Sequence, residues 1–432
     1  MKFNLPHSVH FVGIGGIGMS SLAEHLLKTG HAVSGSDRQP NAQTEKLQKL
    51  GATVFLKHSA QNVQGAQLVV RSSAVPLSNC EVVYAQQHDI PVVLREELLG
   101  YVFDGFSTRI AVCGTHGKTT VTAWIHHLLE RCGVEHAAFI GGEYKGENYF
   151  FGKNTVVAEA CEYNRSFLNL HPTLCVCLNV EHDHPDCYAT EEQTEQAFCK
   201  LFEQSEQVIL PFKQKGLHNG ASVFGGEEIC AENVSLKNGK PSFHLFAKGY
   251  VADVQLSVLG EHNVDNALAV IAVAVRLGLP LLQATKAVST FCGVERRWTK
   301  MPCKVPVVCD YAHHPTEIKT TVRTAKSVCN GKVVCVFQPH TYSRTKAFEK
   351  EFVSCFDGAD EVIYLPIFPA REQPIKNVSA FKLYKMAKAA GKNALYFSSF
   401  QAAAKHLLCV GQNDLIVLVG AGDVNKLALL LN

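Results

Sequence analysis

The chain has 432 residues, of which 47% are hydrophobic and 19% charged, and its formal net charge is +2. This length exceeds one ordinary domain, so we expect two or three. The small net charge gives no reason to expect nucleic acid or a membrane surface as a partner. No apolar run approaches the roughly 18 residues of a membrane span, and the opening Met-Lys-Phe-Asn-Leu-Pro lacks the apolar stretch of a secretory signal. We therefore expect a cytoplasmic protein.

The sixteen cysteines are scattered through apolar, strand-like runs, for example Cys175, Cys177 and Cys335, and no Cys-x-x-Cys pair occurs. Disulfide frameworks are typical of short secreted chains, and zinc sites need clustered ligands. We therefore interpret these cysteines as small buried hydrophobic residues in a reducing compartment.

The first segment begins with a strand at residues 9–12, followed by Gly-Ile-Gly-Gly-Ile-Gly-Met-Ser at residues 13–20. An apolar helix follows and is expected to stop at Gly30, and a second strand leads to Asp37. A glycine loop between strand and helix, with an acid about 20 residues further on, is typical of a dinucleotide-binding βαβ unit. Alone it suggests NAD, but the same geometry would serve any diphosphate, including a nucleotide sugar.

The alternation of strands and helices continues to about residue 106. The sequence predicts a strand at 68–70 leading to Ser72 and Ser73, a helix at 79–88 and a strand at 91–94. We therefore expect a Rossmann-like α/β domain over residues 1–106.

A second glycine loop, Gly-Thr-His-Gly-Lys-Thr-Thr at residues 114–120, lies between a predicted strand at 110–113 and an apolar-faced helix. Backbone N–H groups, the helix N-terminus and Lys118 would hold a phosphate, and Thr119 offers a hydroxyl to Mg²⁺. The match to the P-loop is partial, because Val112 stands where the full pattern has glycine. The alternative is a tight turn with an exposed lysine.

Polar residues follow the next two predicted strands. Glu159 ends the strand at 155–158 and could hold Mg²⁺, as an acid does opposite a phosphate loop. The strand at 174–178 ends in Asn-Val-Glu-His-Asp-His-Pro-Asp at residues 179–186, which suits Mg²⁺ better than zinc. A solvated polar loop is the alternative for this segment. The predicted central domain covers residues 107–298.

The later part of this domain is less informative. Residues 206–258 contain short strand-like pieces with turns such as Lys237-Asn-Gly, and their role stays open. A strongly apolar helix follows and is expected to stop at Gly278. His262 and Asn263 lie just ahead of it and Asn266 on its first turn, where they would either cap the helix or bind a base.

The third segment, residues 299–432, again alternates, which predicts a Rossmann-like C-terminal domain. Predicted strands at 306–309, 333–337, 361–365 and 414–419 each end in polar residues, and Thr316 precedes a predicted helix. Since ligands bind outside the carboxyl ends of strands in an open α/β sheet, these loops should line one cleft. Arg296 and Arg297 just before this domain would either be solvated or bind phosphate.

Taken together, the chain resembles the Mur ligase family, and within it the branch that adds L-alanine. One such motif is weak evidence, but the motifs occur in the family's order from one end of the chain to the other. They lie at residues 13–20, 114–120, 159–163, 179–186, 260–263, 310–318 and 337–340.

The resemblance implies an ATP-dependent ligase of peptidoglycan precursor synthesis. ATP would phosphorylate the lactyl carboxylate of UDP-N-acetylmuramic acid, and the amine of L-alanine would attack the acyl phosphate. The closest alternative is the recycling ligase that attaches a murein tripeptide to the same sugar. A nucleotide-sugar-binding regulator with an idle ATPase loop, and an NAD oxidoreductase, explain less of the chain.

The resemblance also implies roles for individual residues. For the UDP-sugar it implies Gly13, Gly15, Gly16, Gly18, Met19, Ser20, Asp37, Ser72 and Ser73. For ATP it implies Gly114, Thr115, His116, Gly117, Lys118, Thr119, Thr120, His262, Asn263, Asn266, Arg296, Arg297 and Asp310. For the amino acid it implies Tyr311, His313, His314, His340 and Arg344, with Arg344 best suited to the carboxylate. Two Mg²⁺ ions would use Thr119, Glu159 and His184, and the catalytic residues would be Lys118, Glu159 and His184.

Two positions depart from the family's usual pattern. Thr341 stands where many relatives have arginine, which would leave Arg344 alone with the alanine carboxylate. Other ligases of the family use a carbamylated lysine on the second metal; Lys200 is the only candidate here and we do not expect that role. We expect a monomer or homodimer.

Overall fold

The computed structural model describes residues 5–432 and divides into two compact units. The first comprises the chain up to Asn179 together with residues 196–222, and the second comprises residues 180–195 and 223–432. The first four residues, on which part of the expectation about a signal sequence rests, lie outside the described residues.

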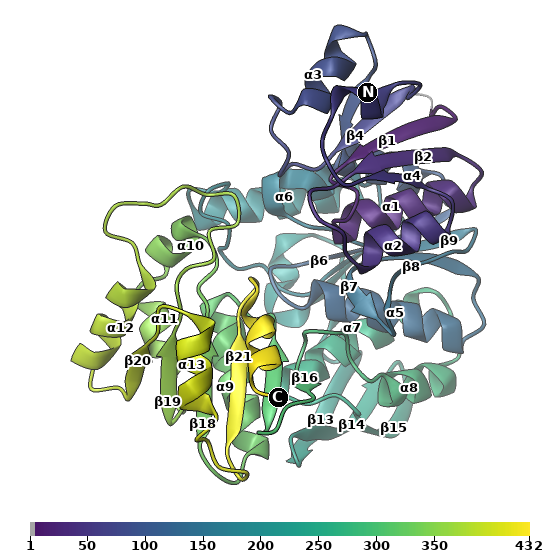
Figure 1. Cartoon of the computed structure of the whole chain (residues 1–432). Coiled ribbons are helices and arrows are strands. Elements are labelled where there is room, and N and C mark those ends of the chain that lie inside the picture. The colour runs from purple at the N-terminus through teal and green to yellow at the C-terminus, as the bar shows by residue number, and fades with distance from the viewer. Residues whose placement is uncertain (1–4) are drawn as a thin grey trace. The chain divides into compact units, whose positions relative to one another are not determined.

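The first unit begins with a five-stranded parallel sheet in the order β3-β2-β1-β4-β5, as the glycine-loop pattern predicts (Figure 1). Its strands are β1 (Ser8–Val12), β2 (Ala32–Ser36), β3 (Thr53–Phe55), β4 (Leu68–Arg71) and β5 (Val92–Leu94). Its helices are α1 (Ile17–Lys28), α2 (Ala42–Lys49), η1 (Ala60–Val63), α3 (Cys80–Gln87) and α4 (Arg95–Asp104).

Local signals set the ends of these helices. Helix α1 ends at Lys28 with Thr29 as its C-cap, and Gly30 follows with φ +89°, the left-handed conformation that glycine adopts most easily. Asn79 caps α3, since its side chain accepts a hydrogen bond from the Glu81 N–H at 2.9 Å. The predicted stop at Gly30 and the predicted helix at 79–88 are therefore confirmed, whereas α2 and α4 were not predicted.

The same unit contains a second sheet, in the order β12-β11-β10-β6-β9-β7-β8. Its strands are β6 (Thr108–Cys113), β7 (His136–Tyr144), β8 (Glu147–Phe150), β9 (Thr155–Glu159), β10 (Leu174–Cys177), β11 (Val208–Pro211) and β12 (Ser222–Phe224). The other elements are α5 (Lys118–Arg131), η2 (Tyr163–Asn169), residues 196–203 of α6 (Glu191–Glu203), and η3 (Phe212–Leu217). Strand β6 pairs in parallel with both β9 and β10, so the ends of these three strands are neighbours.

Buried hydrogen bonds join the two sheets of this unit through α1 and the β7–β8 hairpin. The Asn148 side chain, 1% exposed, donates to the Ile17 carbonyl at 2.7 Å and to the Ser20 hydroxyl at 3.0 Å. His25 forms a hydrogen bond with the Tyr149 hydroxyl at 2.7 Å. These bonds explain why both sheets belong to one compact unit; the domain boundary at residue 106 stays a prediction.

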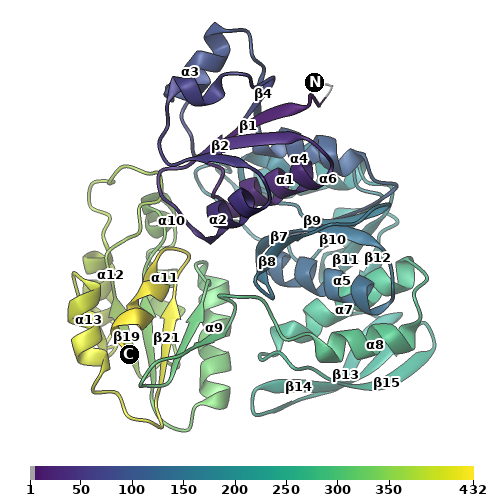
Figure 2. The ribbon, with the colours of Figure 1, turned by 45° about the vertical axis from the view of Figure 1, so that its right-hand side comes forward.

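The second unit contains a three-stranded antiparallel sheet of β13 (Ile229–Lys237), β14 (Lys240–Ala247) and β15 (Tyr250–Gln255). Helices α7 (His262–Arg276) and α8 (Leu281–Thr290) lie along one face of it (Figure 2). The predicted turn is confirmed: Asn238 and Gly239 have φ of +49° and +73°, the combination of a type I′ hairpin. Helix α7 begins at His262, earlier than predicted, so His262 and Asn263 lie within it rather than ahead of it.

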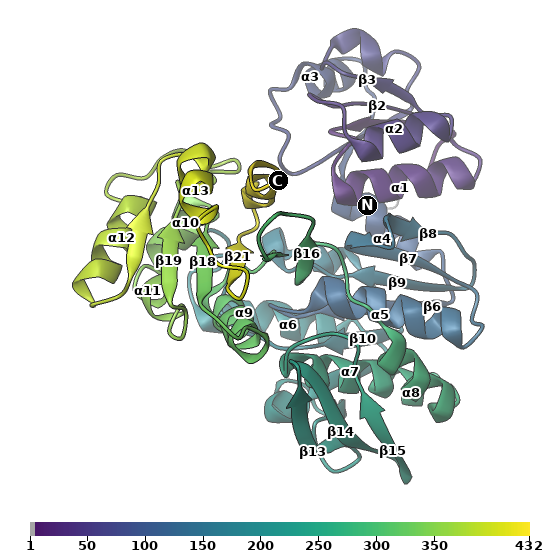
Figure 3. The same ribbon diagram turned by 60° about the horizontal axis from the view of Figure 1, so that its bottom comes forward.

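The rest of this unit is a six-stranded sheet in the order β16-β17-β21-β18-β19-β20, parallel except for β16 (Figure 3). Its strands are β16 (Thr299–Met301), β17 (Val307–Asp310), β18 (Val333–Phe337), β19 (Glu361–Tyr364), β20 (Ala394–Tyr396) and β21 (Leu415–Val419). Helices α9 (Pro315–Val328), α11 (Glu351–Ser354) and α12 (Ala380–Ala389) bury apolar residues on one face. Helix α13 (Phe400–Leu407) and η4 (Val424–Leu430) cover the other, and α10 (Tyr342–Ala347) follows β18.

One expectation for this sheet is wrong in detail. Thr316 does not precede α9 but is its second residue. His314 caps the helix instead, accepting from the Thr316 N–H at 3.3 Å, with Pro315 at the first helical position. Proline is favoured there because the first helical N–H groups have no partner within the helix.

A buried carboxylate, Glu81, stabilises the first sheet beside its glycine loop. It is 0% exposed and accepts hydrogen bonds from Ser36, from the Asn62 amide at 2.7 Å and from the Ser59 N–H at 3.2 Å. Burial raises the pKa of Glu81, but these bonds and the nearby His10 outweigh burial and lower it to about 2. Glu81 therefore stays charged and connects β2 to α3.

We expect Glu81→Gln to lower the free energy of unfolding by about 1–3 kcal/mol near neutral pH. The NH₂ group of the glutamine would face the hydroxyl and N–H groups that now donate to the carboxylate. Since the carboxylate pKa falls on folding from 4.5 to about 2, its contribution is complete above about pH 4.5 and is lost as the pH falls toward 2. Urea unfolding of both proteins from pH 7 to pH 3 measures this difference. The exposed Glu135→Gln is the control; an equal loss there, or a difference that does not shrink in acid, would contradict the prediction.

Candidate active site

The phosphate-type loop lies between β6 and α5 and depends on two glycines with positive φ. Gly114 has φ +135° and Gly117, immediately before α5, has φ +85°. A Cβ atom at residue 114 would lie 3.1 Å from the Asn179 carbonyl oxygen, so a side chain there would push the loop away from β10. The loop backbone is therefore held tightly against the neighbouring strand.

Asn179 fixes the loop from the end of β10, a role that the sequence did not reveal. Its side-chain oxygen accepts from the His116 N–H at 2.8 Å, and its amide donates to the His116 carbonyl at 3.1 Å. Its own carbonyl accepts from the Thr115 N–H at 3.0 Å. Parallel pairing of β6 with β10 is the signal that could have predicted this contact.

Lys118 folds back over the loop instead of extending into solvent. Its ammonium donates to the carbonyls of Gly114 and Thr115 at 2.6 and 3.0 Å and lies 2.9 Å from the Glu162 carboxylate. Burial alone would lower the pKa of Lys118, but the carboxylates of Glu162 and Glu159 outweigh burial and raise it. The alternative of a turn with an exposed lysine is therefore wrong, since this side chain is only 11% exposed.

Thr119 and Glu159 come together as the sequence predicts. The Thr119 hydroxyl donates to a Glu159 carboxylate oxygen at 2.8 Å, because β6 and β9 are neighbours. A Cβ atom at Gly141 would lie 2.2 Å from that carboxylate, so a larger residue in β7 would displace the Glu159 side chain from this position. A hydroxyl beside a carboxylate is an all-oxygen donor set, which suits Mg²⁺ and not the softer zinc.

The first glycine loop is closed by Asp37, at the end of β2. The Asp37 carboxylate accepts from the Gly15 N–H at 2.9 Å, and Asn41 donates to the Gly15 carbonyl at 3.1 Å. Ser72 and Ser73 follow the adjacent β4, and the Ser72 Cβ lies about 4.0 Å from a Cβ placed at Gly13. Met19 and Ser20 are each 2% exposed, so neither residue presents much surface to a ligand here, and their predicted sugar contacts stay a prediction.

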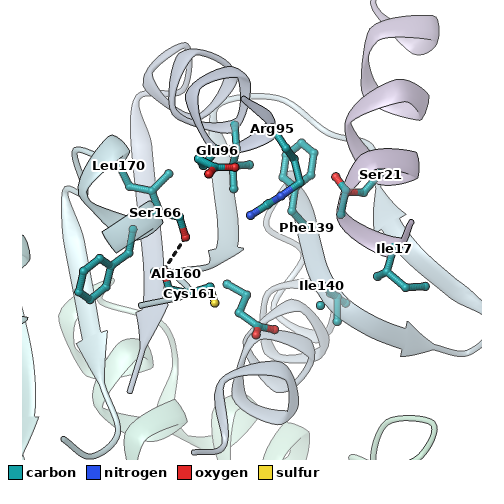
Figure 4. Close-up of a pocket in the computed structure, with 15 residues that line it drawn as sticks. Ile17, Ser21, Arg95, Glu96, Phe139, Ile140, Ala160, Cys161, Ser166 and Leu170 are labelled. Carbon is teal, nitrogen blue, oxygen red and sulfur yellow. Dashed lines mark hydrogen bonds between the residues drawn. The ribbon is translucent and has the colours of Figure 1, made fainter. Parts of the chain in front are cut away.

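A cavity of about 210 Å³ lies between the start of α1 and the end of β9 (Figure 4). Gly18 lines it on one side and Glu159 on the other, so residues predicted for two ligands border one space. Arg95, at the start of α4, points its guanidinium into the cavity. It was not predicted from the sequence, where one arginine after an apolar strand carries no distinctive pattern. The other lining residues are Ile17, Ser21, Glu96, Leu99, Phe139, Ile140, Gly141, Ala160, Cys161, Ser166, Phe167 and Leu170.

In the second unit, the strand ends of the six-stranded sheet meet at one edge. Asp310 is 9% exposed, and its two carboxylate oxygens accept from the N–H groups of Ala312 at 2.8 Å and Trp298 at 3.1 Å. Arg296 donates to the Gly422 carbonyl at 2.8 Å, and its guanidinium lies over the Tyr311 ring. Asp310 and Arg296 thus have structural partners already.

Arg297, the other arginine of the pair, contacts a carboxylate and the same ring. It lies 3.6 Å from the Glu317 carboxylate and 5.1 Å from the centre of the Tyr311 ring, at the start of α9. Its predicted contact with a phosphate stays a prediction.

The predicted amino-acid residues gather at the same edge. The Thr341 N–H donates to the Phe368 carbonyl at 2.9 Å, which joins the loops after β18 and β19. The rings of His313 and His340 lie 6.2 Å apart. Burial, followed by neighbouring cations, lowers the pKa of His340 to about 3, and burial lowers that of His313 to about 4. Both imidazoles are therefore neutral near pH 7.

Arg344 and His184 differ from the prediction in their surroundings. Arg344 is 4% exposed, and its guanidinium binds both carboxylate oxygens of Asp183, at 3.0 and 3.1 Å. His184 follows Asp183 in the chain and has φ +55°. Asp183, part of the loop at residues 179–186 that the sequence predicts as a Mg²⁺ site, thus pairs with Arg344 in this structure.

The first turn of α7 forms a small hydrogen-bonded group. The Asn266 amide donates to the Asn263 side-chain oxygen at 2.9 Å, and Asn263 donates to the Leu259 carbonyl at 2.7 Å. Burial lowers the pKa of His262 to about 4. This group is ordered and neutral, and its predicted contact with a base stays a prediction.

Comparison with known proteins gives the family. Three family models match consecutive parts of the chain: the Mur ligase family catalytic domain at residues 8–107, the Mur ligase middle domain at 112–274, and the Mur ligase glutamate ligase domain at 296–422. A UDP-N-acetylmuramate–L-alanine ligase from Caldanaerobacter subterraneus is 36% identical over 437 residues, covering 96% of this chain and 95% of the relative. The chain belongs to the Mur ligase family.

Other relatives have the same name and near-complete coverage. The UDP-N-acetylmuramate–L-alanine ligase of Acetivibrio thermocellus is 38% identical over 441 residues, covering 97% of this chain and 94% of its own. Among solved structures, UDP-N-acetylmuramate-alanine ligase MurC from Thermotoga maritima has a TM-score of 0.84 at 30% identity, covering 98% and 97% of the two chains. A murein peptide ligase from Psychrobacter arcticus has a TM-score of 0.74 at 22% identity and so shares the fold. The three-domain α/β architecture expected of a Mur ligase is confirmed.

Throughout residues 5–432, helices are too short or too polar to cross a membrane.

We expect Gly141→Ala to weaken ATP binding and to lower turnover by about 10²-fold, because the added methyl group displaces the Glu159 carboxylate by an ångström or more. Calorimetric titration of ATP supplied with Mg²⁺ measures the first effect. The matched control is Gly216→Ala, where a Cβ atom meets nothing within 4 Å and φ is not positive. Equal behaviour of the two variants would show that Glu159 has no part in nucleotide binding.

Proposed function

We propose that this Mur ligase joins L-alanine to the lactyl carboxylate of UDP-N-acetylmuramic acid, with ATP as the energy source, in cytoplasmic peptidoglycan precursor synthesis. The observation that carries the proposal is 35–38% identity over nearly the whole chain to ligases of that name. The cavity that runs from the first glycine loop to Glu159 supports it physically, because it lets one substrate reach the nucleotide loop.

The nucleotide end of the reaction is supplied by residues 114–120. Transfer of a phosphoryl group to a carboxylate brings two anions together, so it needs fixed positive charge more than a covalent catalyst. Lys118, held charged over the loop, would neutralise the β- and γ-phosphates. The loop N–H groups and the N-terminus of α5 would bind the remaining phosphate oxygens.

The oxygen donors of Thr119 and Glu159 fit Mg²⁺, and His184 would serve a second ion. When bound, Mg²⁺ would neutralise charge on the phosphates during transfer. Thr119 and Glu159 are held in place before any ion binds, by their mutual hydrogen bond. Gly141 keeps the space into which the carboxylate fits.

The acid substrate would be bound by residues 1–106. The first glycine loop and α1 would hold the diphosphate, with Asp37 fixing the loop through Gly15. The sugar and its lactyl group would then occupy the cavity toward Glu159. Arg95 would hold an anionic group there, since a guanidinium binds phosphate and carboxylate oxygens in a planar fork.

The amine would be bound by residues 299–432. A carboxylate oxygen attacks the γ-phosphorus and ADP leaves; the alanine nitrogen then attacks the acyl carbon and phosphate leaves. The amine loses one proton on the way to the amide. A nearby histidine or solvent could accept it; burial lowers the pKa of His340 to about 3 and of His313 to about 4, which makes both imidazoles weak bases in this state.

The decisive experiment measures phosphate release from ATP with UDP-N-acetylmuramic acid and a panel of amines: L-alanine, glycine, L-serine and the murein tripeptide. We expect release that requires both the sugar and an amine, and that is fastest with L-alanine. Turnover with the tripeptide and none with alanine would make the chain a recycling ligase. Release without any sugar acceptor would contradict both assignments.

We expect Lys118→Ala and Arg95→Ala to affect different ligands. Lys118→Ala should lower turnover by about 10³-fold, as loss of a charged phosphate ligand does, while UDP-sugar binding survives. Arg95→Ala should weaken binding of the UDP-sugar by about 10-fold, the scale of one charge-assisted contact, and leave ATP binding intact. Calorimetry with each ligand separates the two, and equal loss of both ligands in either variant would mean that the sites are misassigned.

A further inference from the structure

Glu162 is a buried acid beside the phosphate-type loop, and it has no role in the proposed reaction. It lies three residues after Glu159, in the short segment between β9 and η2. Its side chain is 2% exposed, and its two oxygens lie 2.9 and 3.2 Å from the Lys118 ammonium nitrogen. Parallel pairing of β6 with β9 brings the two side chains together, although 44 positions separate them in the chain.

The ammonium group of Lys118 has a protein acceptor for each of its hydrogen atoms. It donates to the carbonyls of Gly114 and Thr115 at 2.6 and 3.0 Å, as well as to Glu162. An ammonium has three N–H donors, so a phosphate oxygen would take the place of one of these partners. The carbonyls are neutral and can be exchanged, whereas a buried carboxylate that loses its cation is strongly unfavourable. We therefore expect Glu162 to keep Lys118 while a phosphate oxygen replaces a carbonyl.

This pairing sets the charge beside the loop. Burial would lower the pKa of Lys118, but the carboxylates of Glu162 and Glu159 outweigh burial and raise it. Lys118 is thus one cation between two carboxylates, and with both acids ionised the three side chains carry a net charge of −1. The N-terminus of α5 offsets only about half of that charge. These groups alone therefore attract a triphosphate weakly.

The sign of this charge reverses when Thr119 and Glu159 hold a divalent cation. The Thr119 hydroxyl lies 2.8 Å from the Glu159 carboxylate, and both offer the oxygen atoms that Mg²⁺ prefers. Each acid then has its own cation: Lys118 for Glu162, and the ion for Glu159. The two carboxylates are therefore suited to different tasks, although they are only three residues apart.

We propose that Glu162 positions the Lys118 ammonium and makes nucleotide binding depend on the divalent cation. The inference rests on the proposed function, which makes residues 114–120 the ATP site. The Glu162 carboxylate offsets the charge of Lys118, so the loop binds ATP weakly without Mg²⁺ and tightly with it. Its two oxygens also hold the ammonium over the loop. Glu162 is a positioning residue, because it acts through Lys118.

The first test titrates ATP into the chain by calorimetry, once with Mg²⁺ and once in EDTA, without sugar or amine. Glu162→Gln removes the charge and keeps the size of the side chain. We expect ATP in EDTA to bind about 10-fold more tightly, because a negative charge beside the phosphates is lost. Binding of ATP with Mg²⁺ should change by about 3-fold or less, since the ion already offsets that charge. The control is Glu135→Gln, an exposed acid beyond the far end of α5, which should leave both affinities unchanged.

Glu162→Asp separates the effect of charge from that of position. It keeps the carboxylate but shortens the side chain by one methylene group. Binding of ATP in EDTA should stay as weak as in the unmodified chain. The kcat of phosphate release should fall by about 10-fold, because the ammonium is held less firmly. Binding in EDTA as tight as that of Glu162→Gln would show that the charge is not the cause.

Two further results would overturn the proposal. If Glu162 were a ligand of the cation, Glu162→Gln would weaken binding of ATP with Mg²⁺ and leave binding in EDTA unchanged. If its role were only structural, both affinities would fall together.

Urea unfolding without nucleotide tests the ion pair by itself. Lys118→Ala leaves Glu162 without its cation, so adding Glu162→Gln should raise the urea midpoint of that variant. A lower midpoint in the double variant contradicts the pairing, whatever reaction the chain catalyses. Failure of the unmodified chain to bind ATP with Mg²⁺ contradicts the proposed function instead, and leaves the unfolding result as it stands.

Discussion

The parallel pairing of β6 with β9 and β10 is the constraint on which the nucleotide end of the site depends. It places the end of β6, which continues into the phosphate loop, between the ends of its two neighbours. Glu159 then reaches Thr119 from one side, and Asn179 reaches the loop backbone from the other. The register of the paired strands brings these residues together, although they lie far apart in the chain. The sheet is therefore part of the catalytic apparatus and not only its support.

Two of the basic groups that the sequence predicts for the site have an acidic partner. Lys118 lies against Glu162, and Arg344 lies against Asp183. The two pairs differ in a way that matters for function. Lys118 donates to two loop carbonyls and lies against one carboxylate, so phosphate oxygens could replace the carbonyls as its partners. Arg344 binds a buried carboxylate through Nε and Nη2, and replacing that partner would leave an unpaired buried charge. A ligand would therefore meet Arg344 at its remaining N–H groups, with Asp183 still in place.

Much of this could be predicted from the sequence, for identifiable reasons. Strand, glycine loop and helix are adjacent in the chain, so the loops at Gly13 and Gly114 and the acids that end strands were visible as local patterns. Asn179, Glu162 and Arg95 were missed as functional groups because their partners lie far away in the chain or on other elements. Helices such as α2 and α4 were missed because they carry mixed polar faces with weak periodicity. The start of α7 was placed late because His262 and Asn263 look like capping residues, yet the helix includes them.

The case of Arg344 shows where motif and geometry separate. An arginine four residues after His340 matches a family pattern, and the pattern suggests a ligand. Asp183, which binds two of its nitrogen atoms, lies 161 positions earlier in the chain. Only the folded chain reveals this contact. A motif states which residues the site needs, whereas the hydrogen-bond partners of each residue determine whether it touches the substrate or holds another residue that does.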